Sequence, residues 1–417
     1  TRYDYDRFDF LIRQETMQGS ETDVIYRVPD FVGNLFETPD KKDRKYGAGG
    51  KLLEDPDCFY HYDDEGNLIF REFKQLQETG VRYDRKRMEK ERGIRCLATG
   101  MGWLYEWASN GMLKKVIRPD GRPVEFRYDA LGRRTAKQYF GKVTRWVWDG
   151  NVPLHEWSYK AIGLQSDEEE NIPPKEPVED ITTWVFEAGT FVPTAKIQES
   201  KQYSIVSDYM GTPIQMFDEQ GNKIWDCTLD IYGKVIAVNK GTEFDCPFRF
   251  QGQYADEETG QYYNRFRYYD SFVGKYSSQD PIRLQGGMQL YNYVKNVNYQ
   301  VDRLGLVETK NFPNFDAARK EAFKIASGGD PNVTFQPTKI DPITGTEVEF
   351  KGSNGSKVAY DSAHPDMDAT KGHHKPHIGV QTGGKRGKGG TQRWNLTYDG
   401  DIHPHRSNVK GTGDLYH

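Results

Sequence analysis

Apolar and polar residues alternate over short stretches throughout residues 1–306, and turns containing glycine separate the stretches. The repeated unit is a Tyr-Asp pair, two or so residues, a glycine, and then an alternating stretch; VEFRYD shows the alternation that flanks one turn. Such turns tolerate positive φ, and the alternation places every second side chain on one face, so each unit predicts a β-hairpin. Because one hairpin cannot bury its apolar face alone, we expect one continuous antiparallel sheet. The clearest units are Tyr60–Phe73, Arg118–Tyr139 and Ser207–Ala237.

The pattern changes after Leu306. PNFDAARKEAFKIAS, residues 313–327, places apolar side chains on one stripe with Asn314 or Asp316 as the N-cap, which predicts a short helix. Stretches bounded by glycine and proline follow and predict strands: VTFQ, EVEFK, KVAYD, HIGVQT and RWNLTYD. A helix followed by a small antiparallel sheet predicts an α+β domain at residues 307–417.

Aromatic residues and glycine are abundant, with 26 Tyr, 22 Phe, 8 Trp and 42 Gly, although the mean hydropathy is −0.84. Large aromatic side chains between glycine turns favour pleated strands over helices. No apolar run approaches the ~18 residues of a membrane span, so no span is predicted. The first residues, TRYDYDRFDF, resemble neither a signal peptide nor a natural start, and we expect the sequence to begin inside a longer protein.

Two charged segments interrupt the alternation. Residues 166–180, SDEEENIPPKEPVED, are acidic and proline-rich, which predicts a surface loop or insertion. RKRMEKERG, residues 85–93, predicts a solvated charged loop. The cysteines have no CxxC spacing, so we expect buried free thiols and neither a zinc ribbon nor a dense disulfide framework. They are Cys58, Cys96, Cys227 and Cys246.

The segment with the most specific motifs is residues 248–306, which contains DPIRL at 280–284, LYNYVKN at 290–296 and DRLGL at 302–306. With the Tyr-Asp units and WVWDGNVPLHEW, it resembles the C-terminal part of an Rhs/YD-repeat core. The resemblance covers residues 1–306 and implies a mainly β fold, a hollow β-cocoon made of a continuous coiled antiparallel sheet. Residues 1–247 would form the shell, residues 248–306 an inward plug with a self-cleavage motif, and residues 307–417 the enclosed toxin.

The same resemblance implies partners and a route. The protein would be made in the cytoplasm and secreted, commonly through a type VI secretion system with its spike protein and a chaperone or adaptor. Its toxin would act in the cytoplasm of the target cell, and a cognate immunity protein would protect the producer. No cofactor is implied. A structural or adhesive YD-repeat protein without catalytic activity is the alternative class.

Members of this family that cut themselves use two aspartates as an aspartyl protease and cleave after the final Leu of the motif. The matching residues here are Asp280 and Asp302, and the matching bond is Leu306–Val307. Two carboxylates that share a proton can activate water and protonate the departing amine. The alternative hypothesis is that both aspartates only cap turns.

Two positions depart from the family pattern: Arg283 replaces the usual Gly, and Arg303 replaces the usual Pro. Because Arg303 is next to Asp302, we expect its charge to hold that carboxylate ionised, which would disturb a shared proton.

Seven of the nine histidines lie in residues 307–417. There 15 Lys+Arg against 13 Asp+Glu give +2, which leaves −7 of the whole-chain −5 for residues 1–306. Imidazoles can act as acid and base, cations hold phosphate, and together they can cleave RNA at a ribose 2′-OH without metal. We predict a metal-independent RNase with His377 and His405 as the acid/base pair and His403 as a further candidate. The candidate phosphate ligands are Lys385, Arg386, Lys388, Arg393 and Arg406.

This region is also loosely similar to the small RNase toxins grouped with barnase, EndoU and RelE. A metal-dependent DNase or RNase with His373, His374 and His377 as ligands stays open, because the HHKPH spacing is weakly diagnostic. An ADP-ribosyltransferase is disfavoured because no Glu follows Glu349, and a zinc deaminase because the region has no cysteine. GGKRGKGG lacks the GxxxxGK[ST] pattern and predicts a basic hairpin tip. Exposed loop histidines without chemistry are the remaining alternative.

Overall fold

The computed structural model describes most of the chain and divides it into two compact units, Thr1–Val297 with Asp302–Glu308 and Asn298–Val301 with Thr309–His417. The described residues are 1–6, 10–18, 21–30, 33–74, 102–161, 176–283, 289–294, 296–306, 309–312, 315–328, 330, 332–341, 344–361, 377–382 and 393–398. None of the helices in these ranges is long and apolar enough to cross a membrane.

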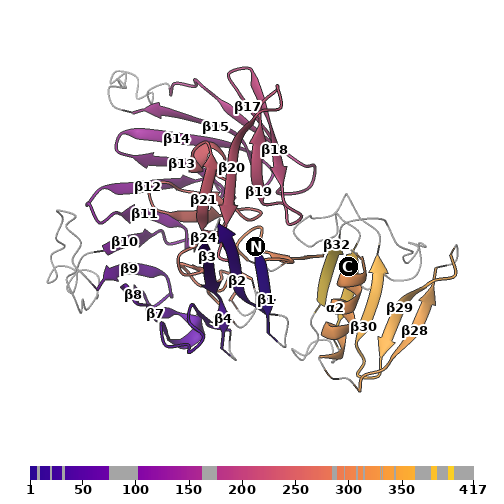
Figure 1. Cartoon of the computed structure of the whole chain (residues 1–417). Coiled ribbons are helices and arrows are strands. Elements are labelled where there is room, and N and C mark those ends of the chain that lie inside the picture. Colours follow the sequence, from indigo (N-terminus) through magenta and orange to yellow (C-terminus); the bar gives the residue numbers. More distant parts are fainter. Residues whose placement is uncertain are drawn as a thin grey trace. The chain divides into compact units, whose positions relative to one another are not determined.

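One antiparallel sheet, which we call the wall, dominates the first unit (Figure 1). Over the described residues it has sixteen strands, and each strand pairs with the next in the sequence from β6 to β21. The predicted continuous sheet of hairpins is therefore confirmed. Its strands are β6 Lys45–Tyr46, β7 Leu52–Glu54, β8 Cys58–Tyr62, β9 Leu68–Phe73, β10 Gly102–Trp107, β11 Leu113–Ile117, β12 Pro123–Tyr128, β13 Arg134–Tyr139, β14 Lys142–Asp149, β15 Val152–Lys160, β16 Thr182–Phe186, β17 Pro193–Gln198, β18 Lys201–Ser207, β19 Pro213–Phe217, β20 Lys223–Leu229 and β21 Val235–Lys240.

The Asp-x-x-Gly turns explain the repeat. In the turn between β12 and β13, Oδ1 of Asp129 accepts hydrogen bonds from the amides of Leu131 (2.9 Å) and Arg133 (2.8 Å). Gly132 has a φ of 75°, which L residues with a side chain rarely adopt. One carboxylate thus closes the turn and the glycine permits it. The same arrangement recurs at Asp208–Gly211, Asp218–Gly221 and Asp230–Gly233, and Asp63 accepts the second of the two hydrogen bonds, from Asn67.

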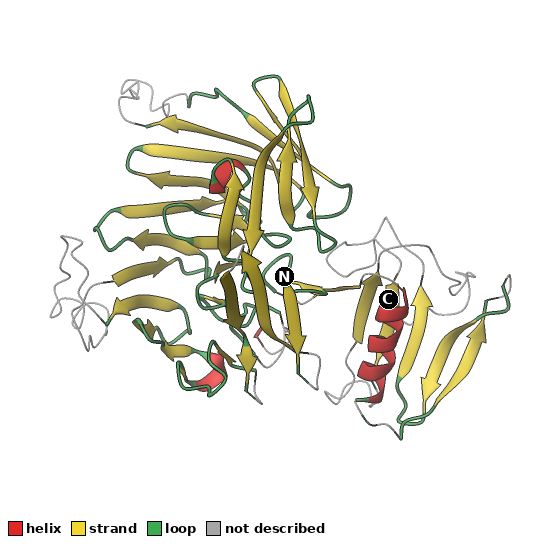
Figure 2. Cartoon of the chain, in the orientation of Figure 1, coloured by secondary structure: helices red, strands yellow, loops and turns green. Residues whose placement is uncertain are grey.

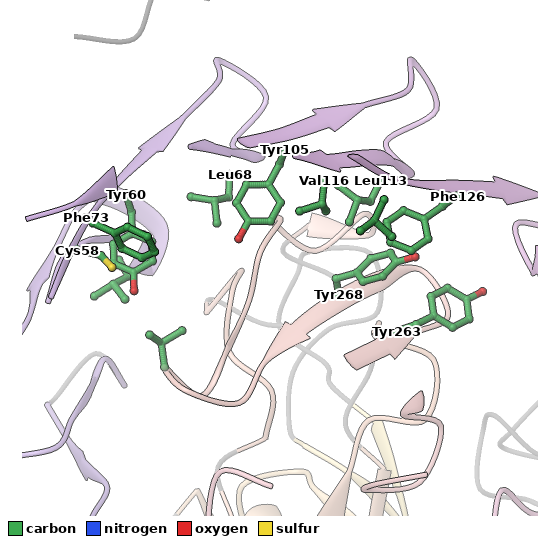
Figure 3. Packing of buried hydrophobic residues seen from close by; sticks show 13 residues of the cluster. Cys58, Tyr60, Leu68, Phe73, Tyr105, Leu113, Val116, Phe126, Tyr263 and Tyr268 are labelled. Carbon is green, nitrogen blue, oxygen red and sulfur yellow. The ribbon is translucent and has the colours of Figure 1, made fainter. Parts of the chain in front are cut away.

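The parts of residues 248–306 that belong to the first unit, Phe248–Val297 and Asp302–Leu306, form what we call the plug. Described aromatic residues of the plug pack on the apolar face of the wall. The plug contains a small sheet of β22 Tyr254–Ala255, β23 Gln261–Asn264, β24 Arg267–Asp270 and β25 Lys275–Tyr276. Its strands are buried on both faces. Tyr263 and Tyr268 pack on wall residues such as Phe126 (Figure 3). Tyr262 and Tyr269 pack in a second cluster. The small sheet of the plug is therefore a layer between two aromatic clusters.

Smaller elements complete the first unit. A three-stranded sheet contains β1 Arg2–Tyr5, β2 Leu11–Gln18 and β3 Glu21–Tyr26, and β4 Val28–Pro29 pairs with β5 Leu35–Phe36. The 3₁₀ helices are η1 Ala48–Gly50 and η2 Glu243–Asp245.

The two charged segments and the cysteines are only partly within the described residues. Residues 176–180, the described part of the acidic segment, form no strand, and Glu176 pairs with Arg145 of β14. Residues 85–93 lie outside the described residues. Cys58, Cys227 and Cys246 are free and buried, as predicted, and Cys96 lies outside the described residues.

Over its described residues the second unit combines helix α2 with a seven-stranded sheet. This arrangement confirms the α+β prediction, and Figure 2 shows the helix beside the strands. The elements are β26 Gln300–Val301, β27 Thr309–Phe312, α2 Phe315–Ser327, β28 Phe335–Ile340, β29 Glu347–Gly352, β30 Lys357–Asp361, β31 His377–Gln381 and β32 Arg393–Tyr398. The order is β26-β27-β32-β31-β30-β29-β28, and α2 packs Ala318 and Ala322 against Ile378 and Leu396.

Three details of this unit differ from the prediction. Strands β26 and β27 were not expected, and β27 pairs with β32 in parallel, so the sheet is not purely antiparallel. Asp316 lies inside the helix rather than at its cap. Asn314, the other cap candidate, lies outside the described residues.

A buried ion pair fastens the plug to the wall. Arg134 of β13 is 1% exposed and pairs with Asp256 of the plug, which also accepts a hydrogen bond from Lys137 at 3.0 Å. The guanidinium carbon lies 4.5 Å from the ring centres of Trp146 and Tyr263. Since cations are attracted to the faces of aromatic rings, these rings replace part of the lost hydration.

Arg134→Ala should lower the free energy of unfolding by about 3 kcal/mol, because it leaves a buried carboxylate short of a partner. The measurement is the denaturation midpoint followed by near-ultraviolet circular dichroism. The matched control is Arg122→Ala, an exposed arginine against Phe140, which should lose less than about 1 kcal/mol. Equal losses in the two variants would contradict this role.

Candidate functional site

Asp280 and Asp302 meet at one guanidinium group. Nη2 of Arg267 lies 3.3 Å from Oδ2 of Asp280 and 3.0 Å from Oδ2 of Asp302. All three side chains are buried, with Asp280 4% exposed and Asp302 1% exposed. The structure therefore brings together the two aspartates that the sequence singled out.

The plug fold sets these positions. Arg267 begins β24 after a tight turn from Asn264, its register partner in β23. Asp280 follows β25, and its amide donates to the carbonyl of Leu290 at 2.8 Å. Nη1 of Arg267 donates to the same carbonyl at 3.2 Å, and Nε donates to the carbonyl of Gly305. One arginine thus ties together the segments that carry both aspartates.

Each aspartate also accepts a hydrogen bond from a nearby turn through its other oxygen. Oδ1 of Asp280 accepts from the amide of Ile282, and Oδ1 of Asp302 accepts from the amide of Leu306, both at 2.9 Å. Both aspartates therefore do cap turns, as the alternative hypothesis holds, while their Oδ2 atoms face Arg267. The second cap has a chemical consequence. The Leu306 carbonyl carbon is two bonds from that amide nitrogen, so it lies within about 6 Å of the carboxylate.

The environment shifts the acidity of the pair. Burial raises the pKa of Asp280 to about 6, against the opposing effect of Arg267. Burial also raises the pKa of Asp302, again opposed mainly by Arg267. A carboxyl group with a pKa near 6 can carry a proton close to neutral pH, as general acid catalysis requires.

The two departures from the family motif have structural explanations. Arg283 has a φ of 52°, in the left-handed region that favours glycine. The expectation that Arg303 holds Asp302 ionised is wrong. Nε of Arg303 donates to Oε1 of Gln251 at 2.8 Å, and the cation paired with Asp302 among the described residues is Arg267.

Sequence reasoning missed Arg267 and Tyr276. The hydroxyl of Tyr276 donates to Oδ2 of Asp302 at 2.9 Å, and the Arg267 guanidinium lies 3.7 Å from the Tyr276 ring centre. Both residues lie in an aromatic-rich run, NRFRYYDSFVGKY, that has two Arg and three Tyr residues. Nothing in the local pattern separates these two from their neighbours, because only the pairing of β23, β24 and β25 decides which side chains reach Asp302.

The predicted catalytic histidine of the second unit, His377, begins β31 and is 2% exposed. Its direct cross-strand neighbours are Asp361 in β30 and Thr397 in β32. Opposite residues of antiparallel strands have Cβ atoms about 5 Å apart, so the Asp361 carboxylate is within reach of the imidazole. A carboxylate beside an imidazole orients the ring and stabilises its protonated form.

These groups share the face of the sheet opposite the helix. Tyr360 and Ile378 pack in the α2 cluster, and successive strand residues point to opposite faces, so Asp361 and His377 lie on the other face. Glu349 lies on that face as well, in register with Ala359, and is 4% exposed. Its Oε1 accepts a hydrogen bond from the Thr338 hydroxyl at 2.9 Å. Sequence analysis used Glu349 only to exclude another chemistry and did not identify Asp361.

The other predicted toxin residues are not described in full. The backbone of Arg393 lies in β32, in register with Gln381. Thr397 of β32 is in register with His377. The residues that lie outside the described ranges are His373, His374, Lys385, Arg386, Lys388, His403, His405, Arg406 and Val307.

Three family models match the chain. Residues 109–144 match the RHS repeat, residues 178–300 the teneurin YD-shell, and residues 290–405 bacterial toxin 47. The chain belongs to the Rhs/YD-repeat polymorphic toxins. The family resemblance found in the Tyr-Asp units and in the plug motif is thus confirmed.

Three curated proteins are similar to this Rhs chain in sequence. Double-stranded DNA deaminase toxin A of Burkholderia cenocepacia (strain H111) is 31% identical over 325 residues, which are 73% of this chain and 21% of that protein. Probable deoxyribonuclease RhsB of Dickeya dadantii (strain 3937) is 30% identical over 262 residues, 62% of this chain and 16% of that protein. Putative uncharacterized protein YibJ of Escherichia coli (strain K12) is 32% identical over 175 residues, 40% of this chain and 75% of that protein. The chain therefore spans about a fifth or less of the first two relatives.

Arg267→Met should abolish the predicted cutting at Leu306, because it removes the cation that Asp280 and Asp302 share. Arg303→Met, an equally buried arginine that contacts Gln251, should retain the cutting. The measurement is the fraction of the Rhs chain cut at Leu306, read on a denaturing gel after expression. Loss of cutting in Arg303→Met with retention in Arg267→Met would contradict the geometry.

Proposed function

We propose that this Rhs chain is part of a secreted antibacterial effector that cuts itself after Leu306 and carries a nuclease at residues 307–417. The observation that carries the proposal is the buried pair Asp280 and Asp302 on one nitrogen of Arg267, with Asp302 also bonded to the amide of Leu306. Because both carboxylates contact the same nitrogen, the protonation state of one changes the pKa of the other, and the two groups titrate as a coupled pair.

The proposed cut is the hydrolysis of the Leu306–Val307 peptide bond. One carboxylate takes a proton from water, the water oxygen attacks the Leu306 carbonyl carbon, and the other carboxyl group protonates the departing nitrogen. The products are a carboxylate at Leu306 and an amine at Val307, so no further reactant is needed. The carbonyl is close to Asp302 because the Leu306 amide is hydrogen-bonded to it.

For the toxin we propose a metal-independent ribonuclease with His377 and His405 as the acid/base pair. The support is the position of His377 in register with Asp361 on the sheet face opposite α2. Asp361 joins the proposal as the residue that orients the imidazole. His403 remains a further candidate, and Lys385, Arg386, Arg393 and Arg406 remain candidates for binding phosphate.

A nuclease that acts on DNA is the second candidate, because one relative is named a probable deoxyribonuclease and another a double-stranded DNA deaminase toxin. Deamination by a zinc site with cysteine ligands does not suit residues 307–417, which contain no cysteine. A metal-dependent nuclease would use His373, His374 and His377 as ligands. The same variants and one chelator test distinguish these candidates.

The route of delivery is part of the proposal. The effector would be made in the cytoplasm, loaded on a type VI spike protein with a chaperone or adaptor, and secreted. The toxin would act in the cytoplasm of the target cell, and a cognate immunity protein would neutralise it in the producer.

Wild-type protein should run as two fragments on a denaturing gel, the smaller of them residues 307–417, about a quarter of the 48.1 kDa chain. Asp280→Asn and Asp302→Asn should each run intact, because neither variant has two carboxyl groups to exchange a proton. The control is Asp218→Asn, which changes an exposed turn of the wall. Continued cutting in both plug variants would exclude the aspartyl mechanism.

Expression of the toxin in bacteria should be lethal, and His377→Ala and His405→Ala should each remove the toxicity because acid/base catalysis contributes about 10²–10⁴-fold. Asp361→Asn should weaken it less. A control in the full chain is His155→Ala, which changes a histidine of the wall and should leave the toxicity of the full chain as it is, whereas full-chain His377→Ala should lose it. Extracted RNA should carry 2′,3′-cyclic phosphate ends, and cleavage in vitro should survive EDTA. Degraded DNA would favour the second candidate, and a need for added divalent metal would make the histidines ligands.

A further inference from the structure

A short chain of hydrogen bonds reaches Asp302 from the last residues of β23 and β25, Asn264 and Tyr276. Nδ2 of Asn264 donates to the Tyr276 hydroxyl at 2.7 Å, and that hydroxyl donates to Oδ2 of Asp302 at 2.9 Å. Nδ2 of Asn264 also donates to the backbone carbonyl of Asp302 at 2.8 Å. Asn264 is fully buried at 0% exposed, and Tyr276 is 2% exposed.

The direction of these bonds is fixed by chemistry. The Asn264 amide nitrogen can only donate, so the Tyr276 oxygen must accept from it. A phenol has one proton, and the remaining neighbour in line is the Asp302 carboxylate, so Tyr276 donates to Asp302. Burial raises the pKa of Tyr276 well above its ordinary value, so the phenol keeps that proton. A donor held in this way stabilises the ionised form of the carboxylate.

The two aspartates differ in what they receive. Asp302 accepts from Arg267 at 3.0 Å, from Tyr276 at 2.9 Å and from the Leu306 amide at 2.9 Å. Asp280 faces Arg267 at the longer distance of 3.3 Å and accepts from the Ile282 amide at 2.9 Å. Asp302 therefore has the stronger set of donors for a negative charge.

Other charged and titratable groups near Asp302 do not reverse this order. Tyr293 presents its hydroxyl oxygen to the Asp302 amide at 3.4 Å rather than to the carboxylate. Arg303 donates to Gln251. Asp280 is the remaining titratable neighbour. Because two negative charges so close together repel each other, Asp280 keeps its proton when Asp302 is ionised.

We propose that Asn264 and Tyr276 are positioning residues that keep Asp302 as the ionised member of the pair, so that Asp302 is the base and Asp280 the acid of self-cleavage. This inference rests on the proposed cut after Leu306 and assigns the order of its proton transfers. Asp302 removes a proton from water, the water oxygen bonds to the Leu306 carbonyl carbon, and Asp280 gives its proton to the nitrogen of Val307 as the carbon–nitrogen bond breaks. Asp302 then holds the proton from water, and its return to Asp280 restores the pair.

The assignment fixes the pH dependence of the cut. Activity requires ionised Asp302 and protonated Asp280, so the rate should form a bell against pH. The alkaline limb should lie near the pKa of Asp280, which burial raises to about 6. The acid limb belongs to Asp302, because the base is lost when that carboxylate is protonated.

The experiment follows the pH profile in the full chain. Protein is synthesised in a cell-free system with a short radioactive pulse and diluted into buffers that span the bell, and the fraction cut is read over time on denaturing gels. Tyr276→Phe removes one donor to ionised Asp302 and should move the acid limb upward by roughly 1 to 2 pH units. The alkaline limb should stay in place, because Tyr276 bonds Asp302 and not Asp280. Asn264→Ala should move the acid limb in the same direction by less.

Tyr262→Phe is the matched control, since it removes an equally buried hydroxyl of the plug that donates to the Gly233 carbonyl at 3.0 Å. Its profile should match that of the wild type. A uniform loss of rate in Tyr276→Phe without movement of the acid limb would mean a structural role only and would overturn the assignment. If the wild type is not cut at any pH, or if Asp280→Asn and Asp302→Asn are cut, the proposed self-cleavage itself fails.

Discussion

The aromatic face of the wall must be covered, and the plug is what covers it. A sheet made of amphipathic hairpins leaves every second side chain on one apolar face, and burial of that face is the main favourable term available to the fold. Tyr263 and Tyr268 of the plug pack against the apolar face of the wall, while Tyr262 and Tyr269 pack on the opposite side of the plug sheet. This packing pins β23, β24 and β25, and these strands in turn hold Arg267 and Tyr276 against Asp302.

The same interface makes buried charge tolerable. A guanidinium group is planar and weakly hydrated, so it can stack on aromatic rings while it pairs with a carboxylate. Arg134 does so between Trp146 and Tyr263, and Arg267 does so on Tyr276. The first pair fastens the plug to the wall. The second places two carboxylates where water is largely excluded and where burial raises the pKa of both groups.

The proposed scissile bond lies in the connection between two paired strands. Strand β26 precedes it and β27 follows it, with Gln300 in register with Lys310 and Val301 with Thr309. The segment Asn298–Val301 belongs to the second unit, whereas the turn that begins at Asp302 belongs to the first unit. The cleavage motif Asp302–Leu306, which belongs to the first unit, thus lies in the sequence between two paired strands of the second unit, β26 and β27.

The sequence alone determined the repeat and the turns, because Asp-x-x-Gly turns and strand alternation are local patterns. It predicted a boundary at Leu306, whereas the two compact units interleave between Asn298 and Glu308. It also identified Asp280, Asp302 and His377, the aspartates through a family motif and His377 through its place at a strand start. It did not identify Arg267, Tyr276 or Asp361, and it assigned the neighbour of Asp302 wrongly to Arg303. Adjacency in sequence places Arg303 next to Asp302, but the buried side chain turns to Gln251. Which cation reaches a carboxylate, and which carboxylate reaches an imidazole, depends on strand register, and only tertiary packing decides that register.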